Sequence, residues 1–312
     1  MRRKILITGG GGFIGSNLVR HLNRARPEVE LVVLDDFSSG AKQNLSGTEC
    51  TVFEGSVLDY PKVLGATHLV DQVVHLAALG SVPRSIENPR ASFDANAMGT
   101  LNILEAARES GARHVVVASS SSVYGTNPSS PRSEDDWTRP MSPYAASKLA
   151  TESLAIAYGL SFGMKALALR FFNVYGPGQS AEHDYAAVIP RFVSSALAGE
   201  GVTIHGDGTQ SRDFTFVRTI CETIEQACIN EVHAPHPVNA AFGTSTSIVE
   251  IVALLEKILG TKVEVAYTAR RTGDVSFSQA DSQIFKRMFP TVREWPLDEG
   301  LAETIRWFQS RA

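Results

Sequence analysis

A tyrosine and a lysine one helical turn apart have the spacing that most directly permits proton chemistry. Tyr144 and Lys148 are separated by three small residues and follow Pro143, which favours the first turn of a helix. At this spacing the two side chains share one helix face, with Cβ atoms roughly 6 Å apart. A free phenol has a pKa of about 10, and a nearby ammonium favours its ionised form. The pair therefore predicts a tyrosine that acts as a base near neutral pH.

A glycine-rich segment near the amino terminus predicts a phosphate site. A short apolar stretch at residues 4–8 runs directly into four consecutive glycines, and a helical pattern follows. A strand, a tight turn and a helix in this order bring backbone N–H groups against the pyrophosphate of a dinucleotide. The predicted cofactor contacts in this turn are Gly9, Gly12, Phe13, Ile14 and Gly15.

The next apolar strand, 30–34, ends in Asp35 and Asp36, about 20 residues past the last of these glycines. A carboxylate here can accept hydrogen bonds from the adenosine ribose and would repel a 2′-phosphate, which favours NAD over NADP. Both aspartates are predicted cofactor contacts, with Asp35 the better ligand and the other carboxylate closing a turn. The oxidised nicotinamide of NAD would add a second positive charge that favours a phenolate at Tyr144.

The elements that position these residues alternate along the first half of the chain. Apolar runs at 4–8, 30–35, 50–54, 72–76, 114–119 and 165–172 predict strands, and residues 13–25, 91–110 and 143–160 predict helices. Such alternation indicates parallel βαβ units. The predicted fold class is α/β, a Rossmann-type doubly wound parallel sheet with a smaller α/β substrate-binding lobe.

The predicted division is an NAD-binding domain over 1–175, with a strand and helix near 237–260 returning to it, and a smaller substrate-binding lobe over 176–312. Beyond about residue 175 the pattern becomes scattered, with helices at 185–199, from 219 and at 247–259. Thr219 and Glu222 have the spacing of a reciprocal helix cap.

Composition excludes several functional classes. A chain of 312 residues with 43% hydrophobic content can bury a full core. Its net charge of −4, without a basic run, argues against a nucleic-acid or membrane surface. Three cysteines without CxxC spacing suit a reducing compartment, and the apolar stretch after the basic start is too short for a signal peptide. We expect a cytoplasmic protein, with no metal site.

Several motifs taken together resemble the extended short-chain dehydrogenase/reductase family over nearly the whole chain. They are TGGGGFIG (8–15), HLAA (75–78), NAMGT (96–100), SSSSVYG (119–125), YAASK (144–148), RFFNVYGP (170–177) and RTGD (271–274). The resemblance implies that Ser120, Tyr144 and Lys148 are catalytic. It also implies cofactor contacts from the residues that follow the third and fourth strands, namely Ser56, Val57, Leu76, Ala77 and Ala78.

The chain departs from the family at two positions. Ser56 stands where the family usually places an aspartate at the adenine, and Arg218 replaces another aspartate. The first change implies a weaker contact to adenine, or one made in another way. The second reads as an exchange of helix caps.

The resemblance further implies a nucleotide-sugar 4-epimerase that uses a UDP-sugar. Family dehydratases carry an aspartate and a glutamate after the catalytic threonine, whereas this chain has Ser121 and Ser122, so elimination of water lacks its acid. Residues 75–86 closely resemble the subgroup acting on UDP-N-acetylglucosamine and its uronate. The substrate contacts carried over are Ser81, Ser121, Ser122, Asn173, Thr203, His205, Arg212, Arg271, Asp274 and Ser278.

We therefore expect a UDP-hexose 4-epimerase that oxidises carbon 4 transiently and keeps its NAD between turnovers. Ser278 stands where epimerases limited to unacetylated sugars carry a bulky tyrosine, so the resemblance implies interconversion of UDP-N-acetylglucosamine and UDP-N-acetylgalactosamine, as well as of UDP-glucose and UDP-galactose. A homodimer through a four-helix contact of helices 91–110 and 143–160 is also expected. The alternatives are a UDP-glucuronate-type epimerase or decarboxylase and a non-catalytic dinucleotide-sensing protein.

Overall fold

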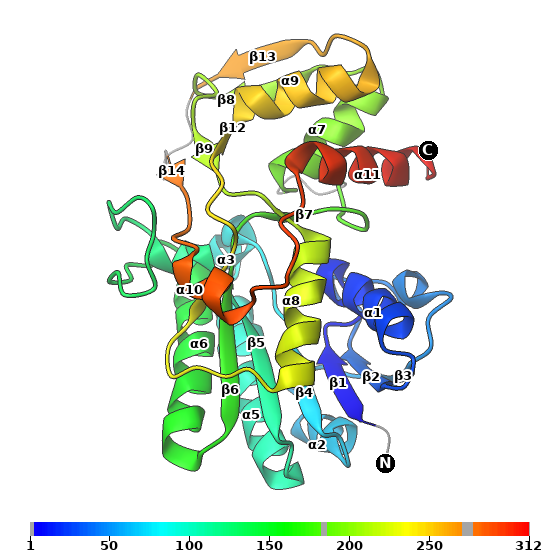
Figure 1. The fold of residues 1–312 in the computed structure, drawn as a ribbon, viewed down its shortest axis with the longest axis vertical. Helices are drawn as coiled ribbons and strands as arrows, with labels where there is room; N and C mark the ends of the chain where they lie inside the picture. Colours follow the sequence, from blue (N-terminus) through cyan, green and yellow to red (C-terminus); the bar gives the residue numbers. More distant parts are fainter. Residues whose placement is uncertain (1–2, 182–185, 270–276, 312) are drawn as a thin grey trace.

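A parallel β-sheet forms the centre of the molecule (Figure 1). The computed structural model describes residues 3–181, 186–269 and 277–311. The sheet has seven parallel strands in the order β11-β6-β5-β4-β1-β2-β3. Their bounds are β1 (Lys4–Thr8), β2 (Glu30–Asp35), β3 (Thr51–Glu54), β4 (Gln72–His75), β5 (His114–Ser120), β6 (Lys165–Phe171) and β11 (Val238–Ala240). The chain changes direction across the sheet between β1 and β4, the switch point at which such sheets bind ligands. The predicted Rossmann-type doubly wound sheet is confirmed.

The sequence of β1 shows why helices cover both faces of this sheet. Ile5 and Ile7 point into one core and Leu6 points into the other, because side chains alternate along a strand. The first core is completed by α1 (Phe13–Ala25) and α8 (Val217–Asn230). The second is completed by α2 (Tyr60–Thr67), α5 (Gly99–Ser110) and α6 (Pro143–Phe162). Strands buried on both faces are continuously apolar, as residues 31–34 of β2 are.

The predicted helix over 91–110 is present, and it contains a π-helical turn that the sequence did not indicate. After α3 (Val82–Glu87), the structure divides this region into α4 (Pro89–Phe93), a π-helical turn η2 (Asp94–Met98) and α5. The π turn holds Asn96, whose Oδ1 accepts a hydrogen bond from the Leu79 backbone N–H at 2.8 Å. A buried polar side chain needs such a partner, and the helix continues through the π turn into α5.

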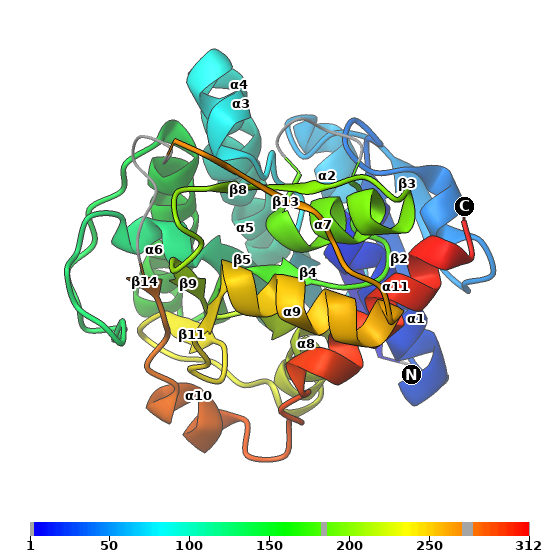
Figure 2. The same cartoon turned by 90° about the horizontal axis from the view of Figure 1, so that it is seen from above.

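A smaller lobe lies beyond the carboxyl ends of the sheet strands (Figures 1 and 2). Its strands pair in small groups, and its helices α7, α9 and α11 pack on one another. The strands are β7 (Val174–Tyr175), β8 (Val202–His205), β9 (Ser211–Arg212), β10 (Thr215–Phe216), β12 (Thr246–Ser247), β13 (Val265–Thr268) and β14 (Phe277–Ser278). The helices that follow β7 and are not yet named are α7 (Val188–Leu197), α9 (Ile248–Leu259), α10 (Gln283–Met288) and α11 (Leu297–Gln309). Two 3-10 turns, η1 (Lys42–Leu45) and η3 (Ser121–Tyr124), complete the described elements.

The predicted cap of α8 is also wrong. The helix begins at Val217, two residues before the predicted start at 219, and it has no side-chain cap. Thr219 is buried inside the first turn, and its hydroxyl donates to the carbonyl of Arg293 at 3.4 Å. The Glu222 carboxylate accepts from the backbone of Arg293 and from Trp295 Nε1 instead of from a helix terminus. Thr219 and Glu222 therefore form hydrogen bonds with the distant segment 293–295 instead of capping the helix.

One contact joins the glycine-turn helix to the lobe. The Asn17 amide on α1 donates to the carbonyl of Pro177 at 2.8 Å and to that of Phe13 at 2.8 Å. Pro177 lies just after β7, where the chain enters the lobe. In the part of the chain that the structure describes, no helix combines the length and apolar character needed to span a bilayer.

Candidate active site

The start of α6 places Tyr144 and Lys148 as their spacing predicts. Ser142 caps the helix by accepting a hydrogen bond from the Ala145 N–H at 3.1 Å, and Pro143 occupies the first turn. Lys148 is 5% exposed, and its ammonium donates to the Ala118 carbonyl on β5 at 2.8 Å. The helix start is therefore fixed against the end of β5.

Burial disfavours the charged form of both groups, so their pKa values move in opposite directions. Burial lowers the pKa of Lys148 to about 8. Burial also raises the pKa of Tyr144, and a hydrogen bond with Ser120 opposes that rise. The chain's own groups therefore do not make Tyr144 a base at neutral pH, because burial outweighs the Ser120 contact. Additional positive charge beside the phenol is required for that role.

Ser120 lies at the end of β5 and faces Tyr144. Its Oγ also accepts a hydrogen bond from the Ser122 N–H at 3.2 Å, which starts the η3 turn. The structure thus brings Ser120, Tyr144 and Lys148 together from β5 and α6. Ser121 and Ser122 lie in η3, and the buried Ser122 hydroxyl has no partner within the described residues.

A buried ion pair that was not predicted from the sequence supports this corner. Glu152, one turn beyond Lys148 on α6, accepts from Arg170 Nε at 3.0 Å and from its Nη2 at 2.7 Å. The same carboxylate accepts from the Ser119 hydroxyl at 2.7 Å. All of these side chains are less than 5% exposed. The i+4 spacing of Glu152 from Lys148 was the available signal, since it places both on the same helix face.

A chain of neutral hydrogen bonds runs beneath Lys148. The Thr100 hydroxyl donates to the Asn96 carbonyl, so it accepts from His75 Nε2 at 3.1 Å. This assigns the imidazole proton to Nε2, and Nδ1 then accepts from the Thr8 hydroxyl at 2.7 Å. Burial, with a smaller contribution from Lys148, lowers the pKa of His75 to about 3, so the imidazole stays neutral. The chain ties β1 and β4 to α5.

The glycine turn fits a dinucleotide phosphate. Gly9 has a φ of 71°, and a Cβ on Gly15 would lie 2.1 Å from the Gly9 carbonyl oxygen, so both positions require glycine. The helix that begins at Phe13 has neither a side-chain cap nor an acidic residue in its first turn. Its first N–H groups, including that of Ile14, can therefore serve an anion.

The two aspartates after β2 have different surroundings. Asp35 is 8% exposed, and its carboxylate accepts from the backbone N–H groups of Gly11 at 2.8 Å and Phe37 at 2.7 Å. Burial raises the pKa of Asp35, and these two bonds oppose the shift. Asp36 Oδ1 accepts from the Ser38 N–H and hydroxyl, which closes a turn. Asp35 is thus held beside the glycine turn, whereas Asp36 has the turn role.

The other predicted cofactor residues lie around the same switch point. The backbone of Leu76 and Ala77 passes so close to Gly9 that a Cβ there would lie 2.7 Å from the Ala77 nitrogen, and Ala78 follows in the same segment. Val57 packs against Gly99 on α5. The Ser56 hydroxyl accepts a weak local bond from the Leu58 N–H at 3.3 Å.

The predicted substrate residues are divided between the sheet domain and the lobe. Asn173 has a φ of 34°, and its side-chain amide donates to the carbonyl of Asp213. Arg212 and Ser278 lie opposite each other in the paired strands β9 and β14. Thr203 and His205 both lie on β8, and His205 forms a hydrogen bond with the Thr268 hydroxyl at 2.8 Å. Ser81 caps α3, because its hydroxyl accepts a hydrogen bond from the Arg84 N–H. Arg271 and Asp274 lie outside the described residues.

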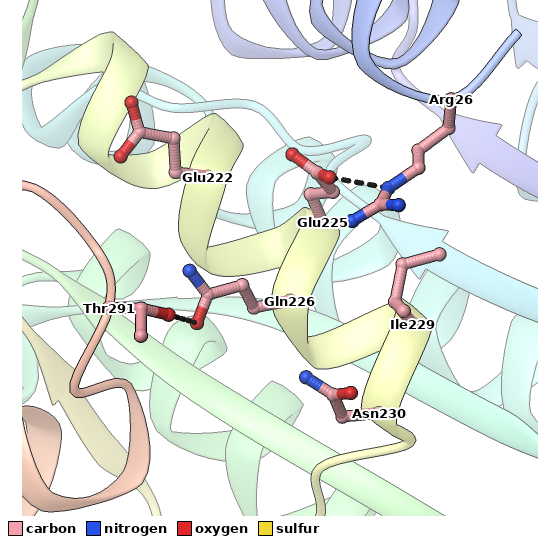
Figure 3. Close-up of a pocket in the computed structure, with 7 residues that line it drawn as sticks. All are labelled: Arg26, Glu222, Glu225, Gln226, Ile229, Asn230 and Thr291. Carbon is pink, nitrogen blue, oxygen red and sulfur yellow. Dashed lines mark hydrogen bonds and ion pairs between the residues drawn. The ribbon is translucent and has the colours of Figure 1, made fainter.

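A polar pocket on the outer side of α8 is separate from this site (Figure 3). It has a volume of 380 Å³, and none of the predicted site residues line it. Its Glu225 carboxylate already accepts from Arg26 at 2.6 Å and from His21 at 2.5 Å, and Gln226 pairs with Thr291. Among the described residues, no group of three metal-binding side chains is present.

The chain is similar to known proteins over nearly its whole length. Residues 5–241 match the NAD dependent epimerase/dehydratase family. The chain belongs to that family. A UDP-glucose 4-epimerase of Mycolicibacterium smegmatis is 34% identical, with 99% of each chain covered. UDP-glucuronic acid decarboxylase 1 of Xenopus tropicalis is 32% identical over 99% of this chain and 72% of its own length. The solved UDP-N-acetylglucosamine 4-epimerase from Methanobrevibacter ruminantium, in complex with UDP-N-acetylmuramic acid, matches with a TM-score of 0.94 and 34% identity over 100% of both chains.

Membership in the epimerase/dehydratase family confirms the resemblance inferred from the motifs and identifies the protein as an enzyme whose cofactor is NAD. The uncapped helix after the glycine turn and the buried Asp35 fit that cofactor. The family includes both epimerases and decarboxylases among the similar proteins, so the reaction itself has to be argued from the site.

Proposed function

We propose that the protein is an NAD-dependent 4-epimerase of UDP-hexoses that interconverts UDP-N-acetylglucosamine and UDP-N-acetylgalactosamine, as well as UDP-glucose and UDP-galactose. The observation that carries the proposal is the convergence of Ser120, Tyr144 and Lys148 at the carboxyl end of β5. The similarity to named 4-epimerases over the whole chain supports it.

In the proposed reaction Tyr144 removes the proton from the sugar 4-hydroxyl, and Ser120 holds the same oxygen by a hydrogen bond. Bound NAD supplies a reversible acceptor for the hydride of carbon 4. Tyr144 keeps the proton while the ketone turns its other face to the cofactor, and then returns it to the new alkoxide. Lys148 favours the phenolate through its positive charge, and proton and hydride both return to the sugar, so the cycle balances.

We assign the cofactor side of the site to the glycine turn, Asp35 and the segment after β4, and the UDP side to the lobe. The proposed boundary is at residue 175. Of the strand and helix expected to return near 237–260, only β11 joins the central sheet, because α9 packs on the lobe helices α7 and α11. A homodimer through α5 and α6 belongs to the same proposal.

A UDP-glucuronate decarboxylase is the second candidate, because one similar protein carries that activity at 32% identity. A dehydratase has less support, since Ser121 and Ser122 offer no carboxylic acid to protonate a leaving hydroxyl. NMR of the products from a panel of UDP-sugars distinguishes these reactions. Inversion at carbon 4 supports the proposal, whereas a pentose product with release of carbon dioxide from UDP-glucuronate contradicts it.

The choice between acetylated and plain sugars is assigned to Ser278. Its strand partner is Arg212, so a larger side chain there would project beside a proposed phosphate contact. Ser278→Tyr should abolish turnover of the N-acetyl sugars and spare UDP-glucose, because the phenol fills the space for an acetamido group. Ser278→Ala is the matched control, since it removes the hydroxyl and keeps the space. An unchanged ratio of acetylated to plain turnover in the tyrosine variant would refute this assignment.

A further inference from the structure

Asp213, directly after β9, is a buried carboxylate at the junction of three segments of the lobe. It is 1% exposed. Its Oδ1 accepts from the Thr244 hydroxyl at 2.8 Å, and its Oδ2 accepts from the backbone N–H groups of Gly243 at 3.1 Å and Ala280 at 3.2 Å. One side chain thereby holds the loop after β11 and the segment after β14 against β9.

The backbone of Asp213 contacts two of the proposed substrate residues. Its carbonyl accepts from the Asn173 side-chain amide at 3.1 Å, and its N–H donates to the Ser278 carbonyl at 2.8 Å. Asn173 has a φ of 34°, which is uncommon for a residue other than glycine. A left-handed residue keeps this backbone only where its surroundings fix it, and the amide contact to Asp213 is part of those surroundings.

The pKa of Asp213 is set by burial and by hydrogen bonds from neutral groups. The four hydrogen bonds that favour its charged form come from neutral groups, two of them from Thr244. Arg212, the last residue of β9, directly precedes it, Asp281 follows Ala280, and the segment 241–245 has no charged side chain. Burial outweighs the hydrogen bonds and raises the pKa of Asp213 to about 6.

We propose that Asp213 is a positioning residue for the nucleotide-sugar site, whose ionised carboxylate holds Asn173, Arg212 and Ser278 in the arrangement that binds a UDP-sugar. When the carboxyl gains a proton, one of its two oxygens becomes a donor, so the side chain accepts less strongly from the groups that it holds in place. This inference rests on the proposed function, because it takes the UDP-sugar as the ligand of the lobe.

We expect protonation of Asp213 to weaken UDP-sugar binding. The same protonation does not lower the stability of the folded protein. The folded-state pKa of Asp213 is raised above its unfolded value, so its contribution to stability is present below the unfolded value and is lost as pH rises through about 6. Acidification through that range therefore favours the folded state as far as Asp213 is concerned. Loss of affinity and loss of structure then have opposite pH dependence for this group.

The test measures UDP-glucose affinity by calorimetry between about pH 5 and pH 8. The NAD-bound protein with Tyr144→Phe prevents turnover, and a sugar diphosphate diester does not itself titrate in this range. Affinity should fall about tenfold for each pH unit below the midpoint, because only the ionised fraction binds. Thr244→Val removes one donor to the carboxylate and should move the midpoint up by about one pH unit. Thr244→Ser keeps the donor and should restore the original midpoint.

The variants distinguish ionisation of Asp213 from titration of another group and from general unfolding. A titrating His205 or a general loss of stability would leave the midpoint the same in Thr244→Val and Thr244→Ser, and that result would overturn the role of Asp213 while the proposed function stands. Asp213→Asn should weaken binding at every pH and remove the acid dependence, with NAD still bound. Absence of UDP-glucose binding at all pH values would overturn the proposed function and this inference together.

Discussion

At Tyr144 burial and hydrogen bonding oppose each other on one phenol. The site shields the side chain from water and so disfavours its ionised form, whereas Ser120 favours that form. Lys148 is buried one turn away. The phenol is thus placed where a positive charge brought by the oxidised cofactor has its largest effect, because screening by water is weak in a buried site.

Tyr144→Phe should lower the turnover of UDP-sugars at least ~100-fold, since it removes the proposed general base and little else. Binding of NAD and UDP-sugar, measured by calorimetry, should remain near that of the unchanged protein. Tyr158→Phe on the same helix is the control, because Tyr158 bonds to Glu105 away from the site and should keep full activity. Substantial turnover by the Tyr144 variant would contradict the assignment.

Lys148 predicts an alkaline limit to activity. Its pKa is lowered to about 8, so the ammonium is present below that pH and is lost above it. Because the ammonium favours the phenolate, the rate constant for turnover should decline as pH rises through about 8. Lys148→Arg carries a charge that does not titrate in this range, so its pH profile should be flat there, though at a lower rate. A decline that persists in the arginine variant would assign the limit to another group.

At the scale of single elements, the glycine turn has the least tolerance for change. A Cβ at residue 15 would meet the Gly9 carbonyl oxygen at 2.1 Å, and that oxygen belongs to the backbone of the turn. Gly15→Ala should lower NAD affinity at least ~10-fold and cost about 1–3 kcal/mol of stability. Thermal unfolding and NAD titration measure the two effects.

Gly65→Ala on α2 is the matched control, because nothing lies within 4 Å of a Cβ placed there. Since alanine is the better helix former, this variant should be as stable as the unchanged protein or slightly more so. Equal losses in both variants would show that the close approach at residue 15 is not the cause.

The apolar runs in the sequence predicted the strands. The features that these local patterns did not predict involve contacts between residues far apart in the sequence. The apolar runs at 4–8 and 114–119 correspond to β1 and β5 because a strand covered on both faces must be apolar throughout. The π turn at Asn96 depends on a partner at Leu79. Thr219 and Glu222 have the spacing of a helix cap, yet they bond to residues 293–295. Neither contact is encoded by residues nearby in the sequence.

The candidate site shows the same division. The i+4 spacing of Tyr144 and Lys148 was sufficient to place both on one helix face. Glu152, Arg170 and His75 could not be given partners from spacing, because their bonds cross between β4, β5, β6 and the helices that pack on them. Local sequence encodes the proposed catalytic groups more plainly than the buried groups that hold them.

At the scale of the whole molecule, the apolar residues left on α6 predict self-association. Leu160 is 72% exposed and Phe162 is 57% exposed at the end of that helix. Burial of these side chains between two copies would remove apolar surface from water. Light scattering at micromolar concentration should therefore give the mass of a dimer, and Leu160→Asp should shift it toward the monomer. A monomer from the unchanged protein would contradict the four-helix contact.

The hydrogen bond from Asn17 to Pro177 has a thermodynamic consequence for the two ligands. The helix that begins at the cofactor turn is joined through this bond to the entrance of the lobe. Any coupling carried by that bond must be reciprocal: if bound UDP-sugar raises the affinity for NAD, bound NAD raises the affinity for UDP-sugar by the same factor. The occupancy of the cofactor site would then rise with the amount of sugar nucleotide that the protein encounters.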